Sequence, residues 1–299
     1  MDETTSRRSA VIALFVLCLI WGFNWTVMKS VLHYVGPMTF SAYRYVLATI
    51  ILFVVLIVRR EPLAPTPWLP TLVIGLAQTA GFQALVQLSL MSGGAGRMAL
   101  IAYTMPFWVI PLAWILLGEK PTPRQWSFTA LAACGLLLIF EPWRVQPSLL
   151  SALLALAGGF CWALGTVLSK KQFQTTDVSL LRLTTWQMAM GSAVLLFVAL
   201  VVPERATEFN TPFLGALAYN ALLSTSLAWV LWLFVVKRLP ANVAGLGSLI
   251  SPLVGVLFAW MLLGEVPDVA EACGIATIAI ALLGVLRPSV KPSPAPPVR

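Results

Sequence analysis

The chain has 299 residues, of which 59% are hydrophobic and only 10% are charged, and its mean hydropathy is +0.89. Soluble domains contain about 45–50% apolar and about 25% charged residues. A globular core of this length cannot hide so much apolar surface behind so few charges. Composition therefore excludes a soluble enzyme, a disordered chain and a secreted disulfide scaffold, and it predicts an all-α polytopic membrane protein.

Charged residues and Pro/Gly clusters divide the chain into ten apolar segments. The predicted spans are 10–28, 39–58, 68–91, 95–117, 126–141, 148–169, 180–202, 212–235, 241–263 and 270–286. Most of them reach the roughly 20 residues needed to cross a bilayer core. We therefore predict ten transmembrane helices, followed by a proline-rich segment, 288–299, that is expected to be a disordered cytoplasmic tail.

Basic residues are distributed unequally between the two sides that these spans define. The side of the N-terminus holds 14 Lys and Arg residues, and the opposite side holds four. Cytoplasmic loops of membrane proteins carry the excess of positive charge. Both termini are therefore expected in the cytoplasm. The positive charges come as singles and pairs, so no nucleic-acid partner is expected.

Two segments of the chain repeat one another. AWILLGEKPT (113–122) and AWMLLGEVPD (259–268) are identical at seven of ten positions, at an offset of 146 residues. The same offset aligns Pro106 with Pro252, and a nearby offset of 141 aligns Trp21 with Trp162. We therefore predict two five-helix repeats, 1–145 and 146–287. Because five is odd, the second repeat crosses the membrane in the opposite sense, as in many secondary transporters.

This arrangement resembles a known family. Ten spans in 5+5 form, a Trp-rich first helix with Asn24, and LLGE followed by Pro in both halves are similar to the drug/metabolite transporter superfamily, EamA type. The resemblance covers about residues 10–287 and is greatest to the YddG-type bacterial exporters of aromatic and other neutral amino acids. It implies a multi-pass transporter of the bacterial inner membrane that exports small neutral metabolites by alternating access.

Polar and aromatic side chains inside the spans are the candidates for a substrate cavity, because polar groups are costly against lipid. In the third span, residues 79, 83 and 87 share one helical face, and bonding between helices is the alternative role for this face. Packing within the bundle is the alternative for the tryptophans. The predicted substrate-binding residues are Trp21, Asn24, Gln78, Gln83, Tyr103, Trp162, Ser224 and Ser248.

Pro106 and Pro252 stand beside stripes of small residues, which begin Ala95, Ala99 in the first half. Small residues permit close helix packing. Proline lacks a backbone donor, so the two prolines are also predicted as hinges for gating.

Arg44 is the one basic residue well inside a predicted span, and two interpretations stay open for it. Snorkelling to the interface is favoured by the cost of burial, and attraction of a substrate carboxylate is the alternative. No Asp or Glu lies near the middle of a span, and the single histidine, His33, lies in a short loop. Proton-driven carriers commonly use such groups, so we expect facilitated diffusion, with a proton-coupled exporter as the alternative.

Two other functional classes are disfavoured. An integral membrane enzyme needs a metal cluster, a nucleophile–base pair or acidic groups at a membrane face, and one His and four scattered Cys do not supply them. A receptor needs a sizeable surface outside the membrane, and the loops are short. We expect no catalysis, no metal and no cofactor. The expected partners are the small neutral substrate and the lipid bilayer, and a homodimer is left open.

Overall fold

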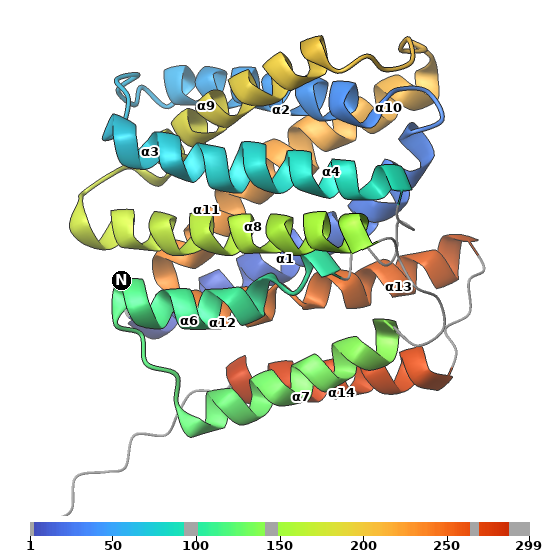
Figure 1. The fold of residues 1–299 in the computed structure, drawn as a ribbon. Helices are drawn as coiled ribbons and strands as arrows, with labels where there is room; N and C mark the ends of the chain where they lie inside the picture. Colours follow the sequence, from blue (N-terminus) through green and yellow to red (C-terminus); the bar gives the residue numbers. More distant parts are fainter. Residues whose placement is uncertain (1–2, 93–100, 141–148, 264–268, 287–299) are drawn as a thin grey trace, which may run out of the picture.

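The computed structural model describes residues 3–92, 101–140, 149–263 and 269–286, and this part of the chain is helical, without a strand (Figure 1). The first half holds α1 (Glu3–Val31), α2 (Pro37–Val58), α3 (Trp68–Ile74), η1 (Gly75–Gly81), α4 (Phe82–Ser92), α6 (Met105–Leu117) and α7 (Pro123–Phe140). The second half holds α8 (Leu149–Thr175), α9 (Leu180–Val201), α10 (Thr211–Tyr219), η2 (Asn220–Leu227), α11 (Ala228–Arg238), α12 (Ala241–Gly247), α13 (Ile250–Leu263) and α14 (Val269–Leu286). The predicted all-α class is confirmed.

The described helices make this a multi-pass membrane protein. Six helical stretches are long and apolar enough to cross a bilayer, namely Arg7–Met28, Pro37–Val58, Trp68–Ser89, Leu149–Thr175, Leu180–Val201 and Thr211–Arg238. Shorter apolar helices are Met105–Leu117, Ala241–Gly255 and Ala272–Ala281. The count of ten spans stays a prediction. The predicted tail 288–299 lies outside the described residues, as do Ala95 and Ala99.

The two halves are built alike and run in opposite directions. In Figure 1, α1 runs from left to right and α8 from right to left, and α2 and α9 are likewise antiparallel. Contacts between helices pair up in the same way, because α4 packs on α8 as α11 packs on α1, and α6 packs on α8 as α13 packs on α1. Equivalent helices also meet directly, α2 with α9 and α7 with α14. This is the two-repeat fold, while its boundaries at 1–145 and 146–287 stay predictions.

Both halves interrupt the same helices at the same places. The π-helical segments η1 and η2 lie in the third membrane helix of each half. Turns at 103–104 and 248–249 precede α6 and α13, just before Pro106 and Pro252. Proline leaves no N–H for a preceding carbonyl. A hydroxyl lies at each break, since Thr104 Oγ1 donates to the Ile101 carbonyl at 2.6 Å and Ser248 Oγ donates to the Gly245 carbonyl at 2.7 Å.

Acidic loop residues of each half bind the start of a helix in the other. The Glu204 carboxylate accepts the N–H groups of Met38 and Thr39, both at 2.8 Å, at the N-terminus of α2. Unpaired donors and the helix dipole favour an anion there. In the opposite direction, Ser179 at the N-cap of α9 donates to the Glu61 carboxylate. The halves are thus joined at both ends of the α2–α9 pair by equivalent acids.

Glycines allow α9 to approach η1 closely. A Cβ built on Gly191 would lie 2.6 Å from Thr79 Cγ2 and 2.7 Å from the Gly75 carbonyl oxygen, whereas a Cβ on Gly215 would meet no atom within 4 Å. Real Cβ atoms do not approach other atoms so closely, so the first position requires glycine and the second does not.

Gly191→Ala is therefore expected to lower the free energy of unfolding by about 1–3 kcal/mol through overpacking. The matched control, Gly215→Ala, is expected to leave stability unchanged or raise it by up to about 1 kcal/mol, because Ala is the better helix former. Thermal unfolding midpoints of the purified variants measure the difference. Equal midpoints for the two variants would contradict the close packing of α9 on η1.

Candidate functional site

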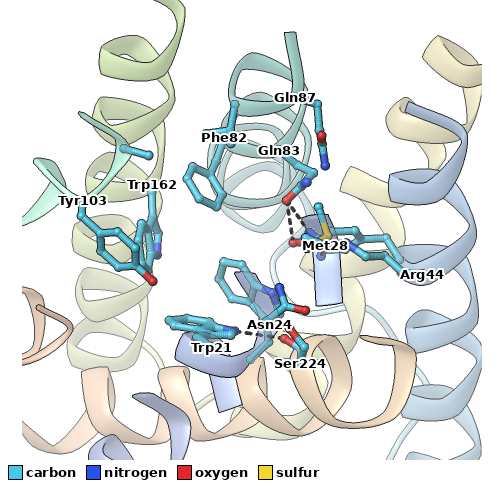
Figure 2. A pocket seen from close by; sticks show the side chains of 14 residues that line it. Trp21, Asn24, Met28, Arg44, Phe82, Gln83, Gln87, Tyr103, Trp162 and Ser224 are labelled. Carbon is cyan, nitrogen blue, oxygen red and sulfur yellow. Dashed lines mark hydrogen bonds between the residues drawn. The ribbon is translucent and has the colours of Figure 1, made fainter. Parts of the chain in front are cut away.

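A cavity of about 80 Å³ lies where the two halves meet. One buried water needs roughly 10–15 Å³ of such space, so the cavity has room for several waters or a small organic ligand. It is lined by Trp21, Asn24, Met28, Arg44, Tyr45, Phe82, Gln83, Val86, Gln87, Ala102, Tyr103, Trp162, Ser224 and Trp229. Figure 2 shows Phe82, Trp162 and Tyr103 on one side and Arg44, Gln83 and Gln87 on the other.

Trp162 of α8 is the centre of the aromatic wall. Its ring centroid lies 5.0 Å from Phe82, 5.4 Å from Trp21 and 6.0 Å from Tyr103. Most of these rings meet edge to face, which their quadrupoles favour. Trp21 Nε1 donates to the Ser224 carbonyl at 3.0 Å, whereas the buried Trp162 Nε1 has no partner in the structure. The aromatic wall therefore combines apolar surface with one available N–H donor.

Arg44 of α2 dominates the polar wall. Its side chain is only 5% exposed, and its Nη1 donates to Asn220 Oδ1 at 3.0 Å and its Nη2 to Gln83 Oε1 at 2.6 Å. Nη1 also lies 3.3 Å from the Met28 sulfur, and the guanidinium stacks 4.9 Å from the Tyr45 ring centroid. The snorkelling interpretation is therefore wrong. Acceptors from three other helical segments replace the water that the interface would have supplied.

Several polar atoms around the cavity have no hydrogen-bond partner although they are buried. The donors are Arg44 Nε and Trp162 Nε1, and the acceptors are Asn24 Oδ1 and Gln87 Oε1. Gln87 is held in place because its Nε2 donates to Ser41 Oγ at 3.1 Å. Buried polar atoms are rarely left unpaired, and such atoms point to a ligand or to water. The cavity thus presents both donors and acceptors beside an aromatic wall.

Six of the eight predicted substrate-binding residues line this cavity, namely Trp21, Asn24, Gln83, Tyr103, Trp162 and Ser224. Their role in binding stays a prediction. Gln78 and Ser248 lie elsewhere: Gln78 Nε2 donates to Thr166 Oγ1 of α8 at 3.1 Å, and Ser248 bonds the carbonyl at its helix break. Gln78 thus bonds between helices, the role that the sequence left open as the alternative for the neighbouring face of residues 79, 83 and 87.

Eight of the 14 lining residues were not among the predicted substrate-binding residues, and Gln87 and Arg44 are two of them. Gln87 was placed by the sequence on the same helical face as Gln83, one turn beyond it, but it was not carried into the set of predicted binding residues. Arg44 was noticed, but the sequence carries no signal that Gln83 and Asn220, 39 and 176 residues away, meet it in space.

A second group of polar contacts closes one end of the bundle, which we call the basic end because Lys170, Lys237 and Arg238 lie there. Glu119, in the loop after α6, accepts the N–H of Ala241 at the start of α12 at 2.8 Å. Lys170 Nζ donates to the carbonyls of Leu239 at 2.8 Å and Lys237 at 3.3 Å. The Glu119 bond joins the two halves. Its counterpart in the repeat, Glu265, lies outside the described residues.

Burial raises the pKa of Glu119 above its ordinary value, and the Ala241 N–H and the Lys170 charge oppose this rise only in part. The folded protein therefore binds a proton at this carboxyl more readily than the unfolded chain does. The stability associated with this proton is fully present below pH 4.5, the ordinary pKa, and is lost as pH rises through the raised pKa.

Relative to Glu119→Gln, the wild-type protein is therefore expected to lose thermal stability as pH rises through this interval. Unfolding midpoints measured at a series of pH values for both proteins give the difference, and Glu208→Gln, at an exposed side chain, is the matched control. Parallel midpoint curves for wild type and Glu119→Gln would contradict the raised pKa.

The known proteins to which this chain is similar include membrane transporters. The model of the EamA-like transporter family matches residues 8–141 and again residues 149–287. The chain is 26% identical to the uncharacterized transporter YoaV of Bacillus subtilis (strain 168), covering 85% of this chain and 89% of that one. It is 27% identical to the probable amino-acid metabolite efflux pump of Escherichia coli (strain K12), covering 87% and 88%.

The chain is also 26% identical to the uncharacterized inner membrane transporter YedA of Escherichia coli (strain K12), covering 96% of this chain and 95% of that one. Among solved structures, one crystal structure matches with a TM-score of 0.80 and 19% identity, covering 93% of this chain and 97% of that chain. At this identity the structural match shows a shared fold.

Proposed function

Because the chain belongs to the EamA-like transporter family, whose model matches both of its halves, we propose that it exports neutral amino acids with apolar side chains across a bacterial inner membrane. One relative is named a probable amino-acid metabolite efflux pump, and another an inner membrane transporter. The observation that carries the substrate class is the cavity between the halves, in which an aromatic wall faces a hydrogen-bonding wall.

The two walls suit the two ends of such a substrate. An apolar side chain gains roughly 25 cal/mol for each Å² that it buries, and the rings of Trp162, Phe82 and Tyr103 supply the surface. The polar end of an amino acid finds the unpaired donors and acceptors near Arg44. A phosphorylated substrate needs several positive groups, and Arg44 is the one cation among the described residues that line the cavity.

The two antiparallel halves support alternating access as the proposed mechanism. The cavity takes residues from both of them, Gln83 and Tyr103 from the first and Trp162 and Ser224 from the second. Rocking one half against the other breaks the Glu119–Ala241 bond at the basic end. The helix breaks before Pro106 and Pro252 are the proposed hinges. With the positive-inside distribution of charge, both termini lie in the cytoplasm in this proposal.

Replacement of the central ring tests the site. Trp162→Ala is expected to reduce counterflow of radiolabelled phenylalanine in proteoliposomes by at least about tenfold, since truncating a buried tryptophan removes about 3 kcal/mol or more of packing. Trp126→Ala, at a side chain that is 49% exposed on α7, is the matched control. Wild-type counterflow in Trp162→Ala would place the substrate elsewhere, and absence of counterflow in the wild-type protein would refute the amino-acid proposal itself.

Facilitated diffusion is the proposed mode of transport, because no carboxylate or imidazole is found in the lining of the cavity within the described part of the chain. Uptake of phenylalanine into vesicles is therefore expected to be unchanged by an imposed pH gradient when the membrane potential is clamped at zero. Uptake that rises with the gradient would instead support a proton-coupled exporter of the same family. An ionophore that dissipates the pH gradient is the control within the same experiment.

A further inference from the structure

Resting on the proposed transport function, we propose that the cavity recognises its ligand by a carboxylate bound at Arg44, and that the amino group of the ligand contributes no affinity. Aromatic monocarboxylates that lack an amino group are then ligands of the same site. Three observations carry this inference: the state of the Arg44 donors, the charge of the groups around them, and the residue that stands at the equivalent position of the second half.

Arg44 has N–H donors that are not used within the described part of the protein and that can bind an anion. A guanidinium carries five N–H donors, and the three contacts to Met28, Asn220 and Gln83 use three of them. The Nε–H, which is buried and unpartnered, and one N–H of Nη2 remain. Two donors on one planar group match the two oxygens of a carboxylate, the ligand for which arginine is best suited.

The groups around Arg44 leave its charge uncompensated. Its partners are an amide, a second amide, a thioether and an aromatic ring, and no Asp or Glu is among the cavity-lining residues that the structure describes. A buried charge without a counter-ion is unfavourable, and an anionic ligand removes this penalty. A monocarboxylate neutralises the cavity, whereas a zwitterion leaves it with the original positive charge.

Among the described residues of the cavity, the ammonium group of an amino-acid ligand has no charged partner comparable to the one that Arg44 offers its carboxylate. Asn24 Oδ1 and Gln87 Oε1 are neutral acceptors, which serve a hydroxyl or a water as well as they serve an N–H. Neither replaces the hydration of a full positive charge, and the Arg44 guanidinium repels that charge. The amino group is therefore tolerated beside the carboxylate and is not selected.

The second half shows that the fold itself does not need this charge. Arg44 and Gln187 are each the eighth residue of equivalent helices, α2 and α9. Arg44 bonds Asn220 of η2, and Gln187 bonds Thr79 of η1, with Thr79 Oγ1 donating to Gln187 Oε1 at 2.9 Å. At this equivalent contact between the halves, a neutral amide thus joins α9 to the π-helical segment η1. The positive charge in the other half has a purpose besides packing.

A matched ligand series tests the inference. Binding of L-phenylalanine, 3-phenylpropanoate and 2-phenylethylamine to the purified protein is measured at neutral pH by the fluorescence of the cavity tryptophans and by competition with radiolabelled phenylalanine. We expect 3-phenylpropanoate to compete at least as strongly as phenylalanine, and phenylethylamine to compete at least tenfold more weakly. Competition by the amine as strong as that by 3-phenylpropanoate overturns the inference.

The same experiment separates the two proposals. If phenylalanine binds and 3-phenylpropanoate does not, the carboxylate inference fails while amino-acid transport stands. If 3-phenylpropanoate binds and phenylalanine does not, the carboxylate site stands and the amino-acid proposal fails. If none of the three ligands binds, both proposals fail.

Two substitutions of Gln83 separate the charge of Arg44 from its packing. Gln83→Glu places a carboxylate where the amide oxygen now lies 2.6 Å from Nη2, and it is expected to weaken both carboxylate ligands at least tenfold without lowering the thermal midpoint. Gln83→Met removes the hydrogen bond without adding charge, and it is expected to keep the preference for 3-phenylpropanoate over phenylethylamine. A folded Gln83→Glu protein that retains wild-type carboxylate affinity overturns the inference.

Discussion

Hydrogen bonding without water is the constraint on which the arrangement of this bundle depends. Inside a bilayer every backbone polar group must find its partner within the protein. This protein nevertheless breaks helices at 103–104 and 248–249 and distorts them in η1 and η2. These departures are possible because hydroxyl and amide side chains bond the affected carbonyls, as Thr104, Ser248 and Ser226 do. The irregular backbone therefore coincides with the buried polar residues.

The symmetry of the two halves determines where those residues meet. The equivalent tryptophans Trp21 and Trp162 pack edge to face at 5.4 Å, so the repeat brings its own aromatic residues together at the centre. Each π-helical segment contacts the second helix of the other half, η2 with α2 and η1 with α9. Symmetric packing would give two identical cavity walls. Arg44 lines the cavity whereas its counterpart Gln187 does not, so the cavity is unsymmetrical, as a site for an asymmetric ligand requires.

The sequence predicted the fold better than it predicted the site, for a physical reason. The length of the apolar segments and the placement of charges predict membrane helices, because the bilayer imposes the same requirements on every helix. The repeated LLGE segment predicts the two halves. The aromatic and amide candidates inside the spans could also be found, because polar groups in lipid are costly. Which of these residues share a cavity depends on contacts between residues that are far apart in the sequence. Gln78 and Gln83 look equivalent in the sequence, yet Gln78 bonds Thr166 of α8 and Gln83 bonds Arg44.

Arg44 shows how such a contact changes an interpretation. The cost of burying an arginine favours snorkelling when its neighbours are unknown, but the cost falls when acceptors from several helices surround the guanidinium. Those acceptors come from both halves, since Gln83 belongs to the first and Asn220 to the second. A ligand shifts the balance between two conformations only by binding them with different affinity. A rearrangement of the halves that moves Asn220 away from Arg44 frees another donor for a ligand, so in the proposed site Arg44 also senses how the halves are packed.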